Sequence, residues 1–212
     1  NLASSLAAFY ERAGTVTTLG GMTGSVTIIG AVSPPGGDLT EPVTALTQRF
    51  VRGVWSLDHD LAYARHYPAV SWSGSFSRDA DNIAAWYAHH GDAEWARRRL
   101  RIAAVLAESD RLSALAELVG ASSLPDRERV ALLGGRLIRE GVLQQTALDA
   151  NEAWCGPAKG AALADAVLDA IEVCGDVVDA GISAARLETF DFSPLLRAAR
   201  DVGRDEIGEI CA

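Results

Sequence analysis

The sequence predicts an α+β fold in which a short region with β-strands is followed by an all-helical region. Residues 1–78 contain four of the seven prolines, runs of β-branched residues and glycine-rich turns. Residues 79–212 contain almost no strand pattern, and their apolar residues recur at the three- and four-residue spacing of amphipathic helices. We therefore place a division near residue 78.

The first elements are a helix and a pair of strands. Residues 3–13 have a helical pattern that stops at Gly14, and residues 15–19 and 25–32 are β-branched runs joined by the glycine-rich segment 20–24. Residues 26–32 form an uninterrupted apolar run, which is typical of a strand buried on both faces of a parallel sheet. The run is followed by a Pro-Pro-Gly-Gly turn and an acidic segment, an arrangement that places polar groups at the carboxyl edge of a sheet.

A second helix is predicted from Thr44 to about His66. Its apolar residues are spaced by four, four, three and four positions: Leu46, Phe50, Val54, Leu57 and Leu61. Tyr67-Pro68 ends it, because a residue before proline disfavours the α conformation. Residues 69–72 then return to an extended run.

The helical region is predicted as a series of separate helices. A long helix over residues 93–119 ends at Gly120, and Ser123 with Asp126 three residues later marks the start of the next helix. A further helix begins near Pro157, since proline is favoured in the first turn. Two short helices start at Ser183 and at residues 193–194, and the latter ends at Gly203. The helix that begins near Pro157 presents one apolar face, formed by Leu163, Val167, Ile171, Cys174 and Val178.

These strands are too few to form a closed α/β layer. An apolar strand over residues 26–32 needs neighbours on both edges and cover on both faces. We therefore expect the chain to be a fragment whose sheet partners lie upstream, an interpretation that the start of the chain inside a predicted helix also favours.

Composition excludes several classes of function. The chain is 49% hydrophobic and 22% charged, as in ordinary globular proteins, and its net charge of −9 argues against general nucleic-acid binding. No apolar run approaches the roughly 20 residues of a membrane helix, so direct membrane insertion is not expected. Three cysteines without a Cys-x-x-Cys pair indicate reduced thiols: Cys155, Cys174 and Cys211.

The sequence lacks a phosphate-binding loop. Such a loop is rich in glycine and ends in Lys-Ser or Lys-Thr, whereas the only lysine, Lys159, has neither the glycines nor the hydroxyl residue around it. An apolar strand ending in an aspartate for magnesium is also missing. No catalytic residue and no metal ligand is therefore predicted in this chain.

Other polar groups have a structural interpretation that outweighs a functional one. Asp38 and Glu41 are interpreted as loop caps rather than as an acid–base pair, because no nucleophile or metal site accompanies them. His89 and His90 are adjacent, which is poor geometry for a metal on a helix. The arginines between residues 97 and 101 are interpreted as a solvated face, with contact to an acidic partner as the alternative.

Several ordered motifs resemble the catalytic A subunit of V-type and A-type rotary ATPases and differ from the non-catalytic B subunit. They are LAAFYERAG at residues 6–14, the run 24–44, RHYPAVSW at 65–72, WY at 86–87 and REGVLQQ at 139–145. The likeness covers nearly the whole chain and weakens after about residue 180. It implies the end of a P-loop-type α/β nucleotide-binding domain over residues 1–78 and an all-α C-terminal helical bundle over residues 79–212.

The resemblance also implies a site for the adenine ring. In this family the aromatic residue at Tyr67, with Pro68, forms one wall of the pocket, and the segment of Gln144, Gln145 and Leu148 forms the other. The family usually has phenylalanine where this chain has Val142 and Leu148, so a smaller stacking contribution is expected.

The resemblance implies a protein in which ATP hydrolysis or synthesis is coupled to the transport of protons or sodium ions. The intact protein would bind ATP or ADP with magnesium, whereas this fragment is expected to be inactive and to bind no nucleotide tightly. Its partners would be the central stalk and the B subunit, with residues 120–129 near the stalk, in a cytoplasmic assembly peripheral to the membrane. The alternative is a stand-alone helical interaction module without catalytic activity.

Overall fold

The computed structural model describes residues 1–211, apart from the side chain of Cys211, and its chain divides into two compact units. The first unit contains residues 1–56 and 74–80, and the second contains residues 57–73 and the chain from Asp81 onward. No helix within the described part is both long and apolar enough to cross a membrane.

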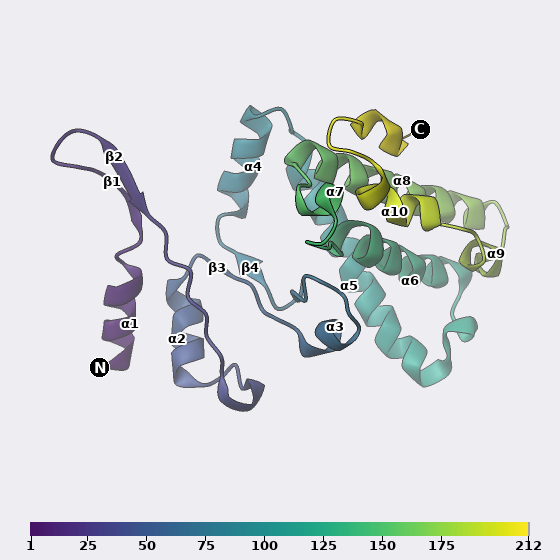
Figure 1. Ribbon diagram of the computed structural model, residues 1–212. Coiled ribbons are helices and arrows are strands. Elements are labelled where there is room, and N and C mark those ends of the chain that lie inside the picture. Colours follow the sequence, from purple (N-terminus) through teal and green to yellow (C-terminus); the bar gives the residue numbers. More distant parts are fainter. Residues whose placement is uncertain (212) are drawn as a thin grey trace. The chain divides into compact units, whose positions relative to one another are not determined.

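The first unit contains helices and two small antiparallel sheets (Figure 1). In the first sheet Gly14 is opposite Val26, and in the second Gly53 is opposite Ser77. The predicted strand pair around the glycine-rich turn is therefore present. The elements are α1 (Leu2–Tyr10), β1 (Gly14–Thr17), β2 (Thr23–Val26), a 3₁₀ turn (Pro35–Gly37), α2 (Pro42–Phe50), β3 (Gly53–Val54) and β4 (Phe76–Ser77).

The prediction of a buried strand over residues 26–32 was wrong. Strand β2 ends at Val26, and Val26 and Ile29 are 57% and 84% exposed. A β-strand needs a neighbour to pair its backbone N–H and C=O groups, and in the described chain β2 pairs only with β1. The apolar residues after Val26 therefore lie outside any strand of the described chain.

The prediction of one helix from Thr44 to His66 was also wrong. Helix α2 ends at Phe50, because Val51 turns to extended backbone at φ −80° and ψ 154°. A new helix, α3 (His59–Tyr63), begins after Asp58, whose carboxylate accepts hydrogen bonds from the backbone N–H groups of Asp60 and Leu61. The regularly spaced apolar residues thus belong to separate segments, and the cap at Asp58 sets the start of α3.

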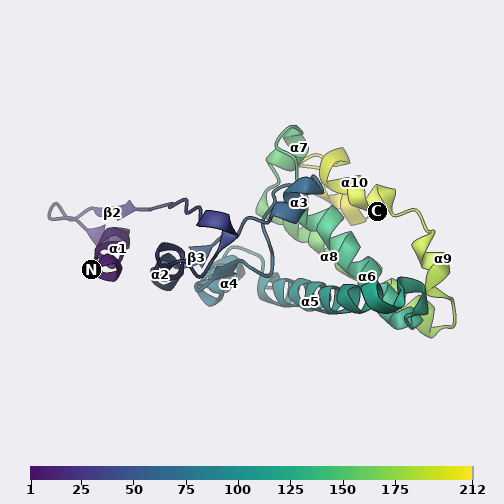
Figure 2. The same ribbon diagram turned by 90° about the horizontal axis from the view of Figure 1, so that it is seen from below.

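The second unit is helical, and no strand follows Ser77 within the described residues. Figures 1 and 2 show α5, α6 and α8 side by side, with α10 beside α8. The elements after α3 are α4 (Ala80–His89), α5 (Trp95–Val119), a 3₁₀ turn (Ala121–Ser123), α6 (Asp126–Ile138), a π-helical turn (Arg139–Leu143), α7 (Ala150–Ala153), α8 (Pro157–Asp179), α9 (Ala184–Glu188), α10 (Ser193–Asp201) and a final 3₁₀ turn (Ile207–Cys211).

Most predicted helix ends agree with the structure, and one predicted cap does not. Helix α5 ends before Gly120, which has a φ of 85°, and α8 begins at Pro157. A helix does follow residue 123, but α6 begins only at Asp126 and Ser123 does not cap it. Ser123 belongs to the preceding 3₁₀ turn, and Pro125 occupies the cap position with no side-chain hydrogen bond.

The main core lies where α5, α6 and α8 meet. Its most buried members include Leu106, Leu137 and Val167, which are at most 2% exposed. Helices α5 and α6 approach closely at Gly135, where an added Cβ would lie 2.3 Å from the Cβ of Ser109. This contact requires a glycine and brings the backbones of the two helices together.

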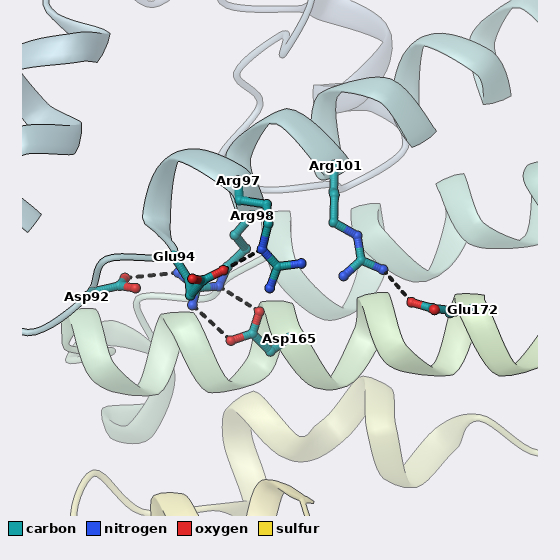
Figure 3. A network of polar contacts seen from close by, with 7 residues as sticks. All are labelled: Asp92, Glu94, Arg97, Arg98, Arg101, Asp165 and Glu172. Carbon is teal, nitrogen blue, oxygen red and sulfur yellow. Dashed lines mark hydrogen bonds and ion pairs between the residues drawn. The ribbon is translucent and has the colours of Figure 1, made fainter. Parts of the chain in front are cut away.

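The arginines at the start of α5 are not simply a solvated face. Arg98 is only 8% exposed and forms a two-bond ion pair with Asp165 on α8, both bonds being 2.8 Å long (Figure 3). Its remaining amino group donates to Asp92 at 2.9 Å. The interpretation as a solvated face was therefore wrong for Arg98, because these carboxylates compensate its burial. Arg101 also reaches α8, through Glu172 at 2.9 Å.

Candidate functional site

The structure brings together the two segments that the sequence singled out. The backbone N–H of Gln145 donates a hydrogen bond of 2.7 Å to the carbonyl oxygen of Tyr67. Both residues belong to the second unit. The contact joins the loop after α3 to the chain that leaves the π-helical turn.

The loop after α3 holds Tyr67 in place through local hydrogen bonds. The N–H of His66 donates to the carbonyl of Leu61 at 2.9 Å, and the hydroxyl of Tyr67 donates to the carbonyl of Ala62 at 3.4 Å. Arg65 has a φ of 58°, which turns the chain sharply before His66. Tyr67 remains half exposed as a residue.

The π-helical turn positions the second segment. Gln144 donates its N–H to the carbonyl of Arg139 at 2.8 Å, which closes the wider turn. Gly141 is buried within it, and a Cβ at this position would lie 3.3 Å from Val167 and 3.4 Å from Leu196. The turn therefore packs directly against α8 and α10. Single π-helical turns are frequent at functional sites.

Helix α7 closes the far end of the segment. The N–H of Thr146 donates to the carboxylate of Glu152 at 2.6 Å. Asp149 caps α7 by accepting hydrogen bonds from the N–H groups of Asn151 and Glu152. The residues after Gln145 are thus held between the loop of Tyr67 and α7.

Two neighbouring surface pockets open beside this contact. The smaller, of about 320 Å³, lies within the usual size range of small-ligand sites. It is lined by Tyr67, Pro68, Gln145, Thr146, Ala147, Glu152 and Ala153. The larger, of about 480 Å³, is lined by Arg65, Tyr67, Glu140, Gln144, Gln145, Thr146, Glu152, Leu196, Arg197, Ala199 and Arg200.

The predicted site residues do not all lie at these pockets. Tyr67, Pro68 and Gln145 line the smaller pocket, while Gln144 lines only the larger one. Leu148 is 97% exposed and lines neither. Val142 packs against the main core instead of forming a free wall.

The larger pocket is strongly polar. Three arginines and two glutamates line it, so its walls can pair with either charge. Beside it, burial lowers the pKa of His66, and the nearby positive charge of Arg139 lowers it further, while Glu140 acts in the opposite direction. His66 therefore favours its neutral form at this position.

Sequence reasoning missed several lining residues. The α10 residues carry no local signal for a pocket, because only the tertiary fold brings them to the turn at residues 139–143. Thr146 lies inside the predicted segment, whereas Glu152 lies four residues beyond Leu148 and could have been found by extending that segment. The role of Lys159 was also missed: its side chain is 1% exposed, and its ammonium donates to three backbone carbonyls.

The smaller pocket has both apolar and polar lining residues. The exposed ring of Tyr67 and the ring of Pro68 offer apolar surface, and Gln145 and Thr146 add polar groups at its edge. No group of His, Cys, Asp or Glu among the described residues could hold a metal ion. The lining residues of this pocket offer both apolar contact surface and hydrogen-bonding groups.

Two family models match the chain in succession. Residues 1–77 match the nucleotide-binding domain of the ATP synthase alpha/beta family, and residues 84–172 match the C-terminal domain of V and A type ATP synthase. The V-type ATP synthase alpha chain of Nitrosococcus oceani is 49% identical over 186 residues, which are 88% of this chain and 32% of that protein. The chain belongs to the family of A subunits, or alpha chains, of V-type and A-type ATP synthases.

Further relatives agree with this assignment. The A subunit of the A-type ATP synthase of Desulfurococcus sp. (strain SY) is 44% identical over 85% of this chain and 31% of its own length. That of Pyrococcus horikoshii is 40% identical over 99% of this chain and 21% of its own length. The chain thus spans about a third or less of these relatives.

A solved structure also resembles the fold. The ATP synthase subunit NeqB from Nanoarcheaum equitans matches with a TM-score of 0.67 and 25% sequence identity. The match covers 80% of this chain and 39% of that one. The α+β architecture, with the end of a nucleotide-binding domain followed by a helical V/A-type domain, is therefore confirmed.

Proposed function

We propose that this chain is the C-terminal part of a catalytic A subunit, in which it supplies the adenine side of the nucleotide site. In the intact protein, ATP hydrolysis or synthesis would be coupled to the transport of protons or sodium ions. Tyr67, Pro68, Gln144, Gln145 and Leu148 are the residues proposed to face the base. The division near residue 78 would separate the end of the nucleotide-binding domain from the helical domain.

The contact between Gln145 and Tyr67 carries this proposal. It joins the two family motifs at one pocket, of a size suited to a small ligand and with an exposed aromatic ring. An adenine ring can stack on an aromatic side chain through its flat face. Polar groups of the pocket can form hydrogen bonds with the nitrogen atoms at the edge of the base. Leu148 is 97% exposed and lines neither pocket, so its proposed contact with the base requires a shift of the segment toward the pocket.

The catalytic groups for the phosphates would come from elsewhere in the intact protein. Phosphoryl transfer depends on a phosphate-binding loop, a magnesium ion and a residue that positions water. This sequence has no such loop. The chain alone would therefore be inactive, and magnesium would be bound with ATP or ADP in the full-length protein.

The proposed partners are the central stalk and the non-catalytic B subunit. The corner between α5 and α6 fits a contact surface, because Leu118 and Val119 are 83% and 51% exposed there. The assembly would lie in the cytoplasm, attached to the membrane through other proteins of the complex.

The test is a matched pair of tyrosine variants in the full-length protein. Tyr67→Ala removes the proposed stacking surface, whereas Tyr63→Ala removes an exposed tyrosine on α3 that lines neither pocket. Loss of one stacked base contact costs about 1–3 kcal/mol, so Tyr67→Ala should weaken Mg-ADP binding roughly tenfold. Equal binding by both variants in calorimetry would refute the proposed adenine wall.

Two further observations separate this proposal from a stand-alone interaction module. Calorimetry on the 212-residue chain should show no tight Mg-ATP binding, and a micromolar site would contradict the proposal. The natural reading frame should extend upstream and encode a Gly-x-x-x-x-Gly-Lys-Ser/Thr loop. A frame that began near Asn1 would favour the interaction module.

A further inference from the structure

Lys159 is the most deeply buried charged side chain among the described residues. It is 1% exposed, and its ammonium donates to the carbonyl oxygens of Ala199 at 2.6 Å, Val202 at 2.7 Å and Asn151 at 3.0 Å. An ammonium has three N–H donors, so all of them are used. The proposed function gives this residue no role.

The position of Lys159 in its own helix is unfavourable. It lies in the first turn of α8, which begins at Pro157, and the helix dipole disfavours a positive charge at that end. This unfavourable position is compensated by the C-terminal end of another helix, α10. Ala199 and Val202 lie at the end of α10, where carbonyl oxygens have no partner within the helix and a positive charge is favoured.

Lys159 and Asn151 together cap α10. The side-chain amide of Asn151 donates to the carbonyl of Arg200 at 2.8 Å, between the two α10 carbonyls that Lys159 binds. The ammonium of Lys159 also reaches α7, through the carbonyl of Asn151. It thus fastens α7 and α10 to the start of α8.

Both fastened helices form walls of the two pockets. Helix α7 contributes Glu152, whose carboxylate holds Thr146 next to Gln145. Helix α10 contributes Ala199 and Arg200 to the larger pocket. A shift of either helix would therefore move the segment that contacts Tyr67.

We infer that Lys159 is a positioning residue for the adenine pocket: its buried ammonium holds α7 and α10 in the arrangement that sets Gln145 against Tyr67. The inference rests on the proposed function of that pocket. Lys159 does not touch the base itself. It acts through the backbone of α7 and α10, so its loss should affect base binding without affecting phosphate binding.

The test compares Lys159→Met with Arg98→Met in the full-length protein. Both variants remove a buried cation from the helical unit, but the carboxylates bound by Arg98 line neither pocket. Calorimetry would measure binding of Mg-ADP and of magnesium tripolyphosphate, which lacks the base. Asn151→Ala is a milder second variant, because it removes one hydrogen bond from the same cap and leaves Lys159 in place.

Lys159→Met should weaken Mg-ADP binding about three- to tenfold, because misplacing a wall cannot cost more than removing the stacked ring. Tripolyphosphate binding should not change, and Arg98→Met should change neither. Asn151→Ala should show the same pattern with a smaller loss, and it decides the matter if Lys159→Met does not fold. Equal losses of both ligands, or no loss beyond that of Arg98→Met, would overturn the inference.

The Tyr67→Ala variant distinguishes failure of the pocket from failure of the positioning role. If it leaves Mg-ADP binding unchanged, the adenine pocket itself is wrong. If it weakens binding while Lys159→Met and Asn151→Ala do not, the pocket stands and only the positioning role of Lys159 fails.

Discussion

The close approach of α5 and α6 at Gly135 makes a quantitative prediction for the helical core. In Gly135→Ala the new Cβ would lie 2.0 Å from the hydroxyl oxygen and 2.3 Å from the Cβ of Ser109. The Cβ of Ser109 is bonded to its backbone and cannot rotate away, so the helices must separate. Such overpacking costs about 1–3 kcal/mol or more, whereas alanine gains about 1 kcal/mol over glycine in a helix. A net destabilisation of up to about 2 kcal/mol is therefore expected.

A double-mutant cycle can assign this loss to the contact with Ser109. Ser109→Gly removes the two atoms that the new methyl group would meet most closely, and leaves a flexible Arg139 guanidinium nitrogen at 3.1 Å. Its cost in helix propensity is less than about 1 kcal/mol. The double variant Ser109→Gly/Gly135→Ala should therefore recover most of the stability, with a favourable coupling energy of about 1–3 kcal/mol, the overpacking that is relieved. The free energies would be measured by urea unfolding followed by circular dichroism.

Gly175→Ala in α8 is the matched control. The Cβ added there would lie 3.8 Å from a guanidinium nitrogen of Arg127, an ordinary contact. This variant should gain about 0.5–1 kcal/mol. If Gly135→Ala were as stable as Gly175→Ala, or if Ser109→Gly failed to rescue it, the described packing of α5 on α6 would be incorrect.

Three further predictions concern the ion pair, the histidine and the site. Arg98→Met should lower the free energy of unfolding by about 1–3 kcal/mol, less than for a fully buried pair because Asp165 is 42% exposed, and chemical denaturation would measure it. The pKa of His66 is lowered in the folded state, so the unfolded state takes up this proton first as the pH falls, and the native protein loses stability between about pH 7.5 and 5.5. His66→Leu should make this loss smaller. An unchanged slope of the urea midpoint against pH would contradict this. Leu148→Phe should tighten Mg-ADP binding by the full-length protein several-fold through added stacking. Val142→Phe should instead overpack the core and lower the free energy of unfolding by about 1–3 kcal/mol. A loss of stability in both variants would argue against the exposed position of Leu148.

Local signals in the sequence predicted much of the helical region. Gly120 and Pro157 mark helix ends through their own backbone preferences, so these boundaries could be found without tertiary information. The strand pair around residues 20–24 was predictable for the same reason. The apolar run after Val26 was not, because a strand depends on a partner that local sequence does not reveal.

The site was predictable only where the family resemblance named its residues. Tyr67 and Gln145 were expected together and are joined by a hydrogen bond. Arg98 looked solvated because its partner Asp165 is 67 residues away in sequence. Lys159 likewise finds its acceptors in α7 and at the end of α10, and nothing in its local sequence indicates burial.

The central claim is that the pocket between Tyr67 and the segment of residues 144–148 receives the adenine ring. The most direct test is photolabelling of the full-length protein with 2-azido-ADP and magnesium, followed by peptide mapping. We predict that the label is found on Tyr67 or within residues 144–148, and that excess ADP prevents it. Protectable labelling that is confined to other parts of the protein would contradict the claim.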